Sequence, residues 1–343
     1  DEVIEQYGAD ALRTWAANSV PGSDVIFDWK DIKHGYRFLR KFWNAFRFIS
    51  MQIFDEEVSY DEIKDNFDPL DLWILNNLNK VVDNAFANYD FATTITSIEK
   101  FIWHDFCDEY IEAVKYRLYN DDVSDSSRKA AKYTLRNVIE TSLKLLSPIV
   151  PFFAEEVYQY FGDGESIHKT SWPEVNEDLV SEEYENKGNI TVDLIDEVRR
   201  FKSSSKIPLN AQLSEVNVYT NDGNLVEVFN EFSQDIEGTL KIDDLAIKTG
   251  KPEVHEKIIE VEPDMSQIGP MFKKDAGKII GYLKSRDIEE IADELENSGE
   301  LAIGEITVGK DLLNISKEIV GASGKKVDIL QSENLDVIVE VIR

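Results

Sequence analysis

Cysteine is nearly absent from this sequence: Cys107 is the only one in 343 residues. A single thiol excludes an internal disulfide and a zinc site built from several thiolates, and it is typical of a cytosolic protein. No apolar run reaches the ~18 residues that a membrane-spanning helix requires, and the N-terminus carries no signal-peptide pattern. These absences predict a cytoplasmic protein that is neither secreted nor held in a membrane.

Positive charge is also scarce, with 37 lysines and arginines against 67 acidic residues and a formal net charge of −30. Such acidity argues against nucleic-acid binding by the chain as a whole, because phosphate binding depends on lysine and arginine. The basic residues are unevenly placed, however. Residues 30–48 carry six of them against a single acid, interleaved with aromatic residues. This basic segment is therefore the first candidate for a function.

The order of predicted elements indicates two parts. Residues 1–163 have the apolar periodicity of helices, whereas later residues mix helices with strands of period-two alternation. Helices are expected over 29–54, 70–88, 91–119, 128–146, 148–161, 190–205, 275–284 and 288–297. Strands are expected over 213–220, 241–249, 254–262, 301–309, 325–331 and 336–343, and turns over 21–24 and 88–90. The predicted fold class is an up-and-down α-helical bundle followed by a smaller α+β domain.

At ~100° per residue, the basic segment forms a helix with an apolar side and a cationic side. The apolar side holds Ile32, Tyr36, Leu39, Phe42, Trp43 and Phe46. The cationic side holds Lys30, Lys33, Arg37, Lys41 and Asn44, with Arg40 and Arg47 on its flank. Phe48 is the exception, since it falls in the middle of the cationic side. This pattern suits looped RNA, because cations meet phosphates and a ring stacks on an unpaired base. The alternative is a solvated face, with Phe48 covered by a neighbouring loop.

Other residues carry weaker signals. His104 and Cys107 stand three apart on a predicted helix and could both touch a metal ion, but no further ligand is near, so a packed thiol is favoured. A second basic cluster is interpreted as a solvated face or as a support for RNA: Lys115, Arg117, Arg128, Lys129, Lys132 and Arg136. The same two interpretations apply, with contact preferred, to Arg199, Arg200 and Lys202.

Five long motifs follow one another along the chain. In order they are YGADALRTWAANSVPGSDVIFDWKDIKHGYRFLRKFWNAFRFI, DPLDLWILNNLNKVV, YDFATTITSIEKFIWHDFCDEYIEAVKYRLY, LLSPIVPFFAEEVYQYF and SIHKTSWPE. Over residues 1–173 they resemble the part of class I aminoacyl-tRNA synthetases that follows the catalytic domain. Within the valine, isoleucine and leucine group, the resemblance is to valyl-tRNA synthetases of archaeal type.

This resemblance implies a function in tRNA recognition. The family joins valine to tRNA with ATP, but the HIGH and KMSKS signatures that hold ATP are absent here, as is the editing domain. The chain begins with Asp1 inside a helical pattern, so it is expected to be a fragment that binds tRNA(Val) without being active alone. It is expected to hold no cofactor, while the parent enzyme uses ATP. The parent is expected to be cytoplasmic and monomeric, with no DNA or membrane partner.

The resemblance also implies roles for individual residues. Phe48 is expected to stack on an anticodon base, Lys41 to bind a base edge or a phosphate, and Lys30 to face the loop. The rest of the anticodon footprint is expected to comprise Lys33, Arg37, Asn44 and Arg47. Contacts with the tRNA backbone are expected from Arg128, Lys132, Arg199, Arg200, Lys273, Lys274 and Lys278. No residue is expected to be catalytic or to bind a metal.

The same resemblance predicts four segments along the chain. They are a connector after the missing catalytic domain (1–27), the anticodon-binding bundle (28–163), an extended segment with a helix and linker (164–235) and an α+β C-terminal domain (236–343). The tract PDMSQIGPMFKKDAGKIIGYLKS resembles a module appended to some archaeal and isoleucyl-type synthetases. Lys273, Lys274, Lys278 and Lys284 in this tract are expected to form a phosphate-facing helix. The role of the acidic domain around them stays open between a tRNA accessory, a partner-docking module and a structural cap.

Two alternatives stay open at this point. The chain could be the corresponding part of an isoleucyl- or leucyl-tRNA synthetase, which competition between tRNAs would decide. It could instead be a helical scaffold that docks protein partners through its acidic C-terminal domain. The scaffold interpretation predicts no salt-sensitive tRNA binding.

Overall fold

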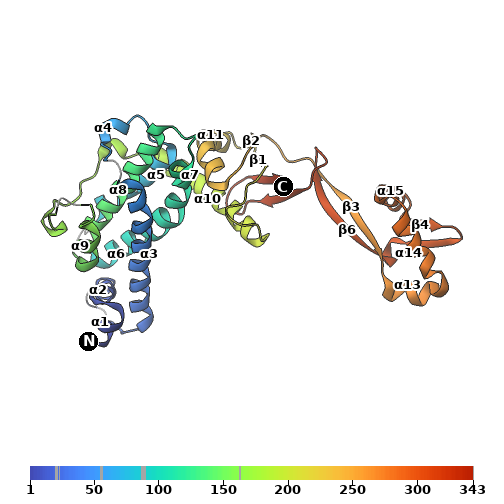
Figure 1. Ribbon diagram of the computed structural model, residues 1–343, viewed down its shortest axis with the longest axis horizontal. Helices are drawn as coiled ribbons and strands as arrows, with labels where there is room; N and C mark the ends of the chain where they lie inside the picture. The colour runs from blue at the N-terminus through green and yellow to red at the C-terminus, as the bar shows by residue number, and fades with distance from the viewer. Residues whose placement is uncertain (20–21, 23, 55–56, 86–89, 162–163, 343) are drawn as a thin grey trace. The chain divides into compact units, whose positions relative to one another are not determined.

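The computed structural model describes residues 1–19, 22, 24–54, 57–85, 90–161 and 164–342. The chain forms two compact units, each built from segments that are separate in the sequence (Figure 1). Unit 1 consists of Asp1–Gln212, Asp222–Leu245 and Glu333–Leu335. Unit 2 consists of Leu213–Asn221, Ala246–Ser332 and the described residues from Asp336 onward. The turns expected at 21–24 and 88–90 include residues outside the described ranges.

Unit 1 is predominantly helical. Its first helices are α1 (Glu2–Tyr7), α2 (Ala9–Ala17), α3 (Trp29–Ile53), α4 (Tyr60–Ile63), α5 (Pro69–Asn84) and α6 (Phe91–Lys100). They are followed by η2 (Phe101–Tyr110), α7 (Ile111–Tyr119), α8 (Asp125–Leu146), α9 (Pro151–Tyr158), η3 (Ile167–Lys169), η4 (Glu177–Leu179), α10 (Glu182–Ser204), α11 (Gly223–Glu231) and α12 (Ser233–Leu240). Among the described residues, no helix has both the length and the hydropathy to cross a membrane.

Helix α3 contains the basic segment, and its start is encoded locally. The Asp28 carboxylate accepts a hydrogen bond of 2.8 Å from the Lys30 backbone N–H, which satisfies one of the free donors at the helix start. Apolar residues then recur every three or four positions and pack into the bundle. The buried ones are Ile32, Phe38, Leu39, Phe42, Phe46, Ile49 and Ile53. One side of α3 therefore belongs to the core, which leaves the opposite side available.

The helix expected over 91–119 is continuous, but its middle third is wound differently. Between α6 and α7, the ten residues of η2 form a π-helix. Phe106 and Tyr110 of this segment are buried, with ring centroids 6.3 Å apart. Apolar spacing predicts a helix over these residues, but it does not show that the backbone hydrogen bonds of η2 span five residues instead of four.

Two glycines bring α10 and α12 against the bundle. A Cβ atom added at Gly188 of α10 would lie 2.3 Å from the Trp73 ring, and one at Gly238 of α12 would lie 2.4 Å from the Tyr116 ring. Helix α10 begins earlier than expected, because the Ser181 side chain accepts a hydrogen bond from the Tyr184 N–H and caps it. The segment boundary predicted at residue 236 lies inside α12.

Unit 2 contains a four-stranded sheet with strand order β2-β1-β8-β7. These strands are β1 (Glu215–Tyr219), β2 (Leu245–Lys248), β7 (Val327–Gln331) and β8 (Ile338–Ile342). β8 pairs antiparallel with both β1 and β7, in a register that aligns Val216 with Val341 and Val218 with Val339. The strand expected over 241–249 is shorter than predicted, because Lys241 ends α12 in a left-handed conformation with φ 55°.

The rest of unit 2 has its own apolar core. Its elements are β3 (Val254–Pro263), α13 (Met265–Phe272), η5 (Lys273–Asp275), α14 (Ala276–Ser285), α15 (Ile288–Ser298), β4 (Glu300–Ile303), β5 (Ile306–Gly309), η6 (Lys310–Leu312) and β6 (Leu313–Gly321). Strand β6 was not expected, because three consecutive polar residues, 316–318, interrupt its alternation. It pairs with β3 across a bulge between Ile258 and Glu260. The predicted fold class, a helical bundle followed by a smaller α+β domain, is confirmed.

Candidate nucleic-acid interface

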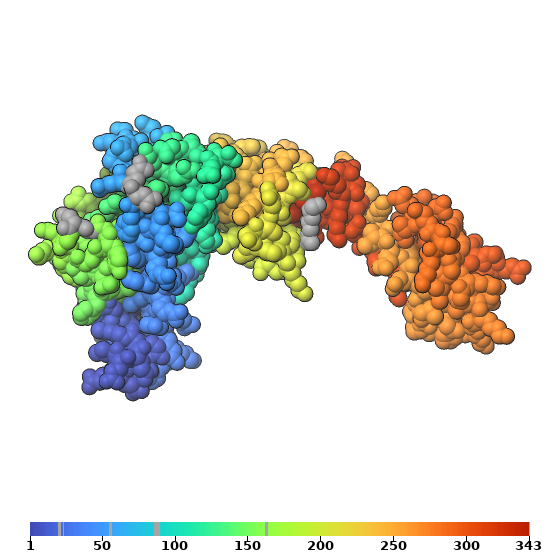
Figure 2. Space-filling view, in the orientation of Figure 1, coloured from blue at the N-terminus to red at the C-terminus, as the bar shows by residue number. Residues whose placement is uncertain are grey.

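The cationic side of α3 is open to solvent. Exposed residues on it are Lys30, Lys33, Arg37, Arg40, Asn44 and Arg47. In the space-filling view, α3 forms part of the visible surface of unit 1 (Figure 2, blue). Within the described part of the chain, no carboxylate lies within 4.0 Å of the charged atoms of these five cations. Their charges are therefore uncompensated by direct ion pairs in an otherwise acidic protein.

Lys41 differs from its neighbours on this face because it is already engaged. Its Nζ atom lies 2.6 Å from Oδ1 of Asp108 and 4.6 Å from the centroid of the Trp103 ring. His34 stacks on the same ring at a centroid distance of 5.8 Å and pairs with Glu99. Lys41 is half-buried. A phosphate or base edge at this position must therefore compete with the Asp108 carboxylate.

Phe48 is half-buried and belongs to a small cluster with α7. Its ring centroid lies 6.3 Å from that of Tyr119, and the Lys115 ammonium lies 5.4 Å from its centroid. Gln52 donates a hydrogen bond of 3.2 Å to the Tyr119 hydroxyl. Tyr119 itself is 60% exposed. The sequence predicted one ring for stacking, Phe48, but the structure places a second ring, Tyr119, next to it. Tyr119 is the last residue of α7, and the sequence analysis assigned it no role.

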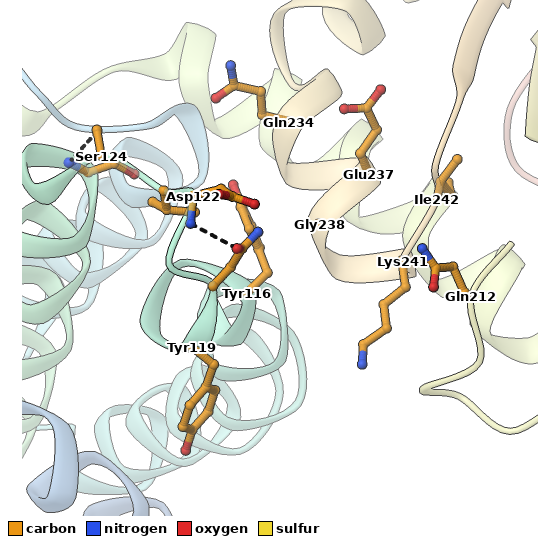
Figure 3. A pocket seen from close by; sticks show the side chains of 13 residues that line it. Tyr116, Tyr119, Asp122, Ser124, Gln212, Gln234, Glu237, Gly238, Lys241 and Ile242 are labelled. Carbon is orange, nitrogen blue, oxygen red and sulfur yellow. Dashed lines mark hydrogen bonds between the residues drawn. The ribbon is translucent and has the colours of Figure 1, made fainter. Parts of the chain in front are cut away.

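An open cavity of 720 Å³ lies beside this cluster (Figure 3). Tyr116 and Tyr119 stand on one side of it, and Gln234 and Glu237 of α12 stand on the other, together with Lys241, the C-cap of that helix. The remaining lining residues are Asn120, Asp122, Val123, Ser124, Ser127, Gln212, Gly238 and Ile242. An adjoining cavity of 320 Å³ shares both tyrosines and adds Lys115 and Arg199. Aromatic, amide and carboxylate groups in one cavity are those that stack on bases and read their edges.

The sequence carries little signal for this cavity. Lys241 lies in a segment expected to be a strand, and Gln212 and Gln234 lie in segments assigned no function. The cavity exists because Gly238 lets α12 rest on the Tyr116 ring. The Tyr116 hydroxyl also donates a hydrogen bond of 3.2 Å to Asp235. Only the packing of α12 on α7 brings these polar side chains together.

Arg117 corrects one part of the second basic cluster. This residue is 1% exposed, so it is neither on a solvated face nor available to RNA. Its two terminal nitrogens donate to the two carboxylate oxygens of Asp71, at 2.7 and 2.8 Å. Nε lies 3.0 Å from a carboxylate oxygen of Asp68 and 3.0 Å from the Ser127 hydroxyl. Tyr110 donates to Asp71 as well, at 2.5 Å. Arg117 is a structural residue that joins α5, α7 and α8.

The proposed backbone contacts of unit 1 are placed unequally. Arg200 is exposed, and Lys132 is half-buried. Arg128 donates to the carbonyl oxygens of Asn120 and Arg117, at 2.9 and 3.3 Å, and so holds the loop that lines the cavity. The guanidinium of Arg199 turns toward η2 and lies 3.3 Å from a carboxylate oxygen of Glu109.

Lys202 is a further correction. It is fully buried, and its ammonium donates to the carbonyl oxygens of Ala211 and Leu240 at 2.8 and 2.6 Å. It therefore cannot contact tRNA. Its role is to hold the C-terminus of α12 next to the segment that precedes β1. Burial, with repulsion from Lys241, lowers the pKa of Lys202 to about 8.

His104 and Cys107 have different surroundings in the structure. Cys107 is buried, and burial raises the pKa of its thiol to about 12, which disfavours the thiolate that binds metals. His104 is turned toward Asp108, with Nδ1 3.7 Å from the carboxylate. No group of three or more metal-ligating side chains gathers among the described residues. The preferred interpretation of a packed thiol agrees with this placement.

The three lysines proposed in the C-terminal part lie in unit 2. Lys273 and Lys274 belong to η5, and Lys278 belongs to the first turn of α14. All three are exposed. The Lys278 ammonium lies 2.7 Å from Oδ1 of Asp275.

Comparison with known proteins assigns the class of the helical unit. A family model described as the anticodon-binding domain of tRNA ligase matches residues 71–218. The matched residues include η2, α7 with its buried Arg117, and α8. Helix α3 lies before the first matched residue. A LeuRS–tRNA–LeuAMS crystal structure from Agrobacterium radiobacter K84 resembles 52% of this chain and 22% of its own, with a TM-score of 0.40 and 18% identity.

Relatives with assigned names extend the assignment to the whole chain. The valine–tRNA ligase of Methanothermobacter thermautotrophicus is 48% identical over 346 residues, which cover 100% of this chain and 38% of that protein. Those of Methanocaldococcus jannaschii and Methanococcus maripaludis are 43% and 41% identical over 98% and 99% of this chain. The chain therefore belongs to the valine–tRNA ligase family. It spans 38–39% of the length of these relatives and corresponds to their C-terminal, anticodon-binding part.

Proposed function

We propose that unit 1 binds the anticodon loop of tRNA(Val) through the cationic face of α3. The observation that carries this proposal is the open face itself, on which five cations, with no ion-pair partner in the described part of the chain, lead to Phe48. A loop of RNA presents closely spaced phosphates and unstacked bases, and this face offers a partner for each. The family assignment supports the same ligand.

Each part of the face has a distinct physical role in this proposal. The exposed cations attract phosphates because no carboxylate among the described residues neutralises them, and phosphate binding releases counterions from the RNA. Phe48 supplies a ring for stacking, and Tyr119 extends that surface toward the cavity between α7 and α12. The cavity gives an unstacked base room to reach amide and carboxylate groups. Phosphate contacts then set the affinity, and the rings and cavity set the preference for particular bases.

The relatives suggest the biological setting. They are named valine–tRNA ligases and are longer than this chain, so we infer that ATP binding and aminoacylation need parts of the enzyme other than these two units. In this proposal the parent is a cytoplasmic, monomeric valine–tRNA ligase. The two units hold no cofactor of their own and contribute recognition of the tRNA.

Fluorescence anisotropy with the 343-residue chain tests the proposal. Valine tRNA transcript is compared with the same transcript carrying a different middle anticodon base, and with an isoleucine tRNA transcript. We expect salt-sensitive binding that weakens for both comparison RNAs. Equal binding to all three would reduce the face to a non-specific phosphate contact. Absence of salt-sensitive binding would favour the protein-docking scaffold.

A further inference from the structure

A second cationic surface lies in unit 2, at η5 and α14. Residues 273–284 contain four lysines and one acid, whereas the following residues 287–300 contain seven acids and no lysine or arginine. Lys273, Lys274 and Lys284 are exposed, and among the described residues no carboxylate lies within 4.0 Å of their ammonium groups. Two other lysines of unit 2 differ, because Lys257 forms an ion pair with Glu289 and Lys317 forms one with Glu256.

Gly277, in the first turn of α14, and Gly281, near its middle, leave this surface without side chains. Gly277 and Gly281 are exposed, neither has a positive φ, and a Cβ atom added at either would meet nothing within 4 Å. Gly188 and Gly238 differ, because each makes room for an aromatic ring of the same chain. Glycine in a helix interior lowers helix stability. Among the described residues, no contact accounts for glycine at either position.

Gly277, Gly281 and Lys284 share one side of α14, and Lys273 and Lys274 precede that helix in η5. At ~100° per residue, Gly277, Gly281 and Lys284 fall within about 60°, and Lys278 lies about 100° from Gly277. The opposite side carries Ala276 and Ile279, which are buried in the apolar core of unit 2. The outward side of α14 therefore has a strip without side chains at Gly277 and Gly281, where a partner can approach the helix backbone. Lys284 supplies positive charge on the same side.

We infer that this surface binds the sugar–phosphate backbone of the same tRNA, an inference that rests on the proposed function. Lysine is a flexible point charge that suits phosphates without requiring a base sequence. The strip suits a sugar–phosphate backbone rather than a base, because glycine has no side chain that could stack on a base or hydrogen-bond to its edge. An acidic protein segment is the competing partner, and the experiment below separates the two.

The test uses three variants of the full chain. The first carries Lys273→Gln, Lys274→Gln and Lys284→Gln. A matched control carries Lys251→Gln, Lys310→Gln and Lys325→Gln, which removes equal charge from three other exposed lysines of unit 2. The third variant carries Gly277→Leu and Gly281→Leu, which fills the bare strip and leaves every charge in place. Circular dichroism and thermal melting check that each variant is folded.

Binding of valine tRNA transcript is measured by anisotropy over a series of KCl concentrations. For the first variant, the slope of log K against log salt should shrink by roughly 2–3, at ~0.7–0.9 per lost phosphate contact. The control should keep the wild-type slope. The glycine variant should melt at the same or a higher temperature and yet bind roughly tenfold more weakly. Discrimination between anticodons should be unchanged in all three.

The outcomes separate this inference from the proposed function. Equal slopes for the lysine variant and its control, or full affinity in the glycine variant, would overturn the inference while anticodon discrimination still supports unit 1. Such a result would assign the lysine surface to a protein partner or to solvent. A reduced slope without any anticodon discrimination in the wild type would leave the inference standing and overturn the proposed function. Absence of RNA binding by the wild type would overturn both.

Discussion

The cations of α3 and the cations near α7 and α8 look alike in the sequence and behave differently in the structure. On α3, five cations point to solvent without an ion-pair partner among the described residues. On α7, Arg117 is 1% exposed and holds Asp71 through two parallel hydrogen bonds. A basic cluster in a sequence therefore indicates available charge only where no other element covers that side of the helix.

The difference follows from what each helix side meets. One side of α3 packs on the bundle, and its opposite side meets solvent. α7 is surrounded by α5, α8 and α12, so a cation there must either reach the surface or find an acid. Arg117 finds Asp71, whose own side chain also accepts a hydrogen bond from the Asp68 N–H at the start of α5. The Arg117–Asp71 pair thus links the N-terminal cap of α5 to α7.

Removing the buried cation should have the largest effect. Arg117→Ala leaves the Asp71 carboxylate buried without its partner, and we expect it to lower the free energy of unfolding by about 3–5 kcal/mol. Urea denaturation followed by circular dichroism measures this loss. Arg37→Ala, on the open face of α3, is the matched control and should change stability by less than ~0.5 kcal/mol. A similar loss of unfolding free energy in Arg117→Ala and Arg37→Ala would show that the buried and the exposed cation do not differ in their contribution to stability.

The carboxyl of Asp235 should give the buried region a pH dependence that the open face lacks. Burial raises its pKa to about 7 in the folded protein, well above the ordinary value of 3.8. The folded state therefore binds a proton that the unfolded state lacks, so the contribution of Asp235 to stability is lost as pH rises toward and through 7. The loss is at most roughly 4 kcal/mol.

Urea denaturation at a series of pH values from about 4 to about 8 checks the effect of Asp235. Asp235→Asn should remove most of the pH dependence and be more stable than wild type at pH 8. Asp244→Asn, at an exposed position on the segment after α12, should keep the wild-type profile. A wild-type profile in Asp235→Asn would show that another group controls this transition.

Phe48 tests the open side of the comparison. We expect Phe48→Ala to weaken binding of valine tRNA by about 1–3 kcal/mol through loss of base stacking. Anisotropy with the wild-type transcript measures this change. Phe54→Ala removes a ring that is 46% exposed at the C-cap of the same helix and that contacts Phe161, at a centroid distance of 5.5 Å, rather than Tyr119, so it should bind as wild type. Equal affinity for wild type and Phe48→Ala would refute the stacking role.

The smallest expected effect concerns Lys41, which stands between the two kinds of cation. Asp108→Asn removes the carboxylate that holds its ammonium at 2.6 Å. We expect tRNA binding at low salt to tighten by up to about 1 kcal/mol, because exposed ion pairs are weak and Lys41 becomes free for RNA. Asp65→Asn, an exposed acid elsewhere in unit 1, controls for the change in net charge. Weaker binding by Asp108→Asn would mean that the ion pair positions Lys41 for its contact.

Residue patterns predicted much of the fold and part of the candidate site. The two-part architecture, the extent of α3 and the position of its cationic side all follow from spacing along one helix. The same reasoning failed for Arg117 and Lys202, because burial by a neighbouring helix leaves no trace in local periodicity. It also missed Tyr119 and Lys241, which meet at one cavity although they are more than a hundred residues apart.

The sequence by itself determined where the helices lie and which side of α3 is apolar, because periodicity is a property of consecutive residues. Tertiary structure alone decided which cations stay free, since the cost of burying a charge depends on what packs against it. It also decided that α12 covers α7 closely enough to form the cavity, which requires the missing side chain of Gly238 to lie opposite the Tyr116 ring. Pairing between distant helices is not encoded in the spacing of either one.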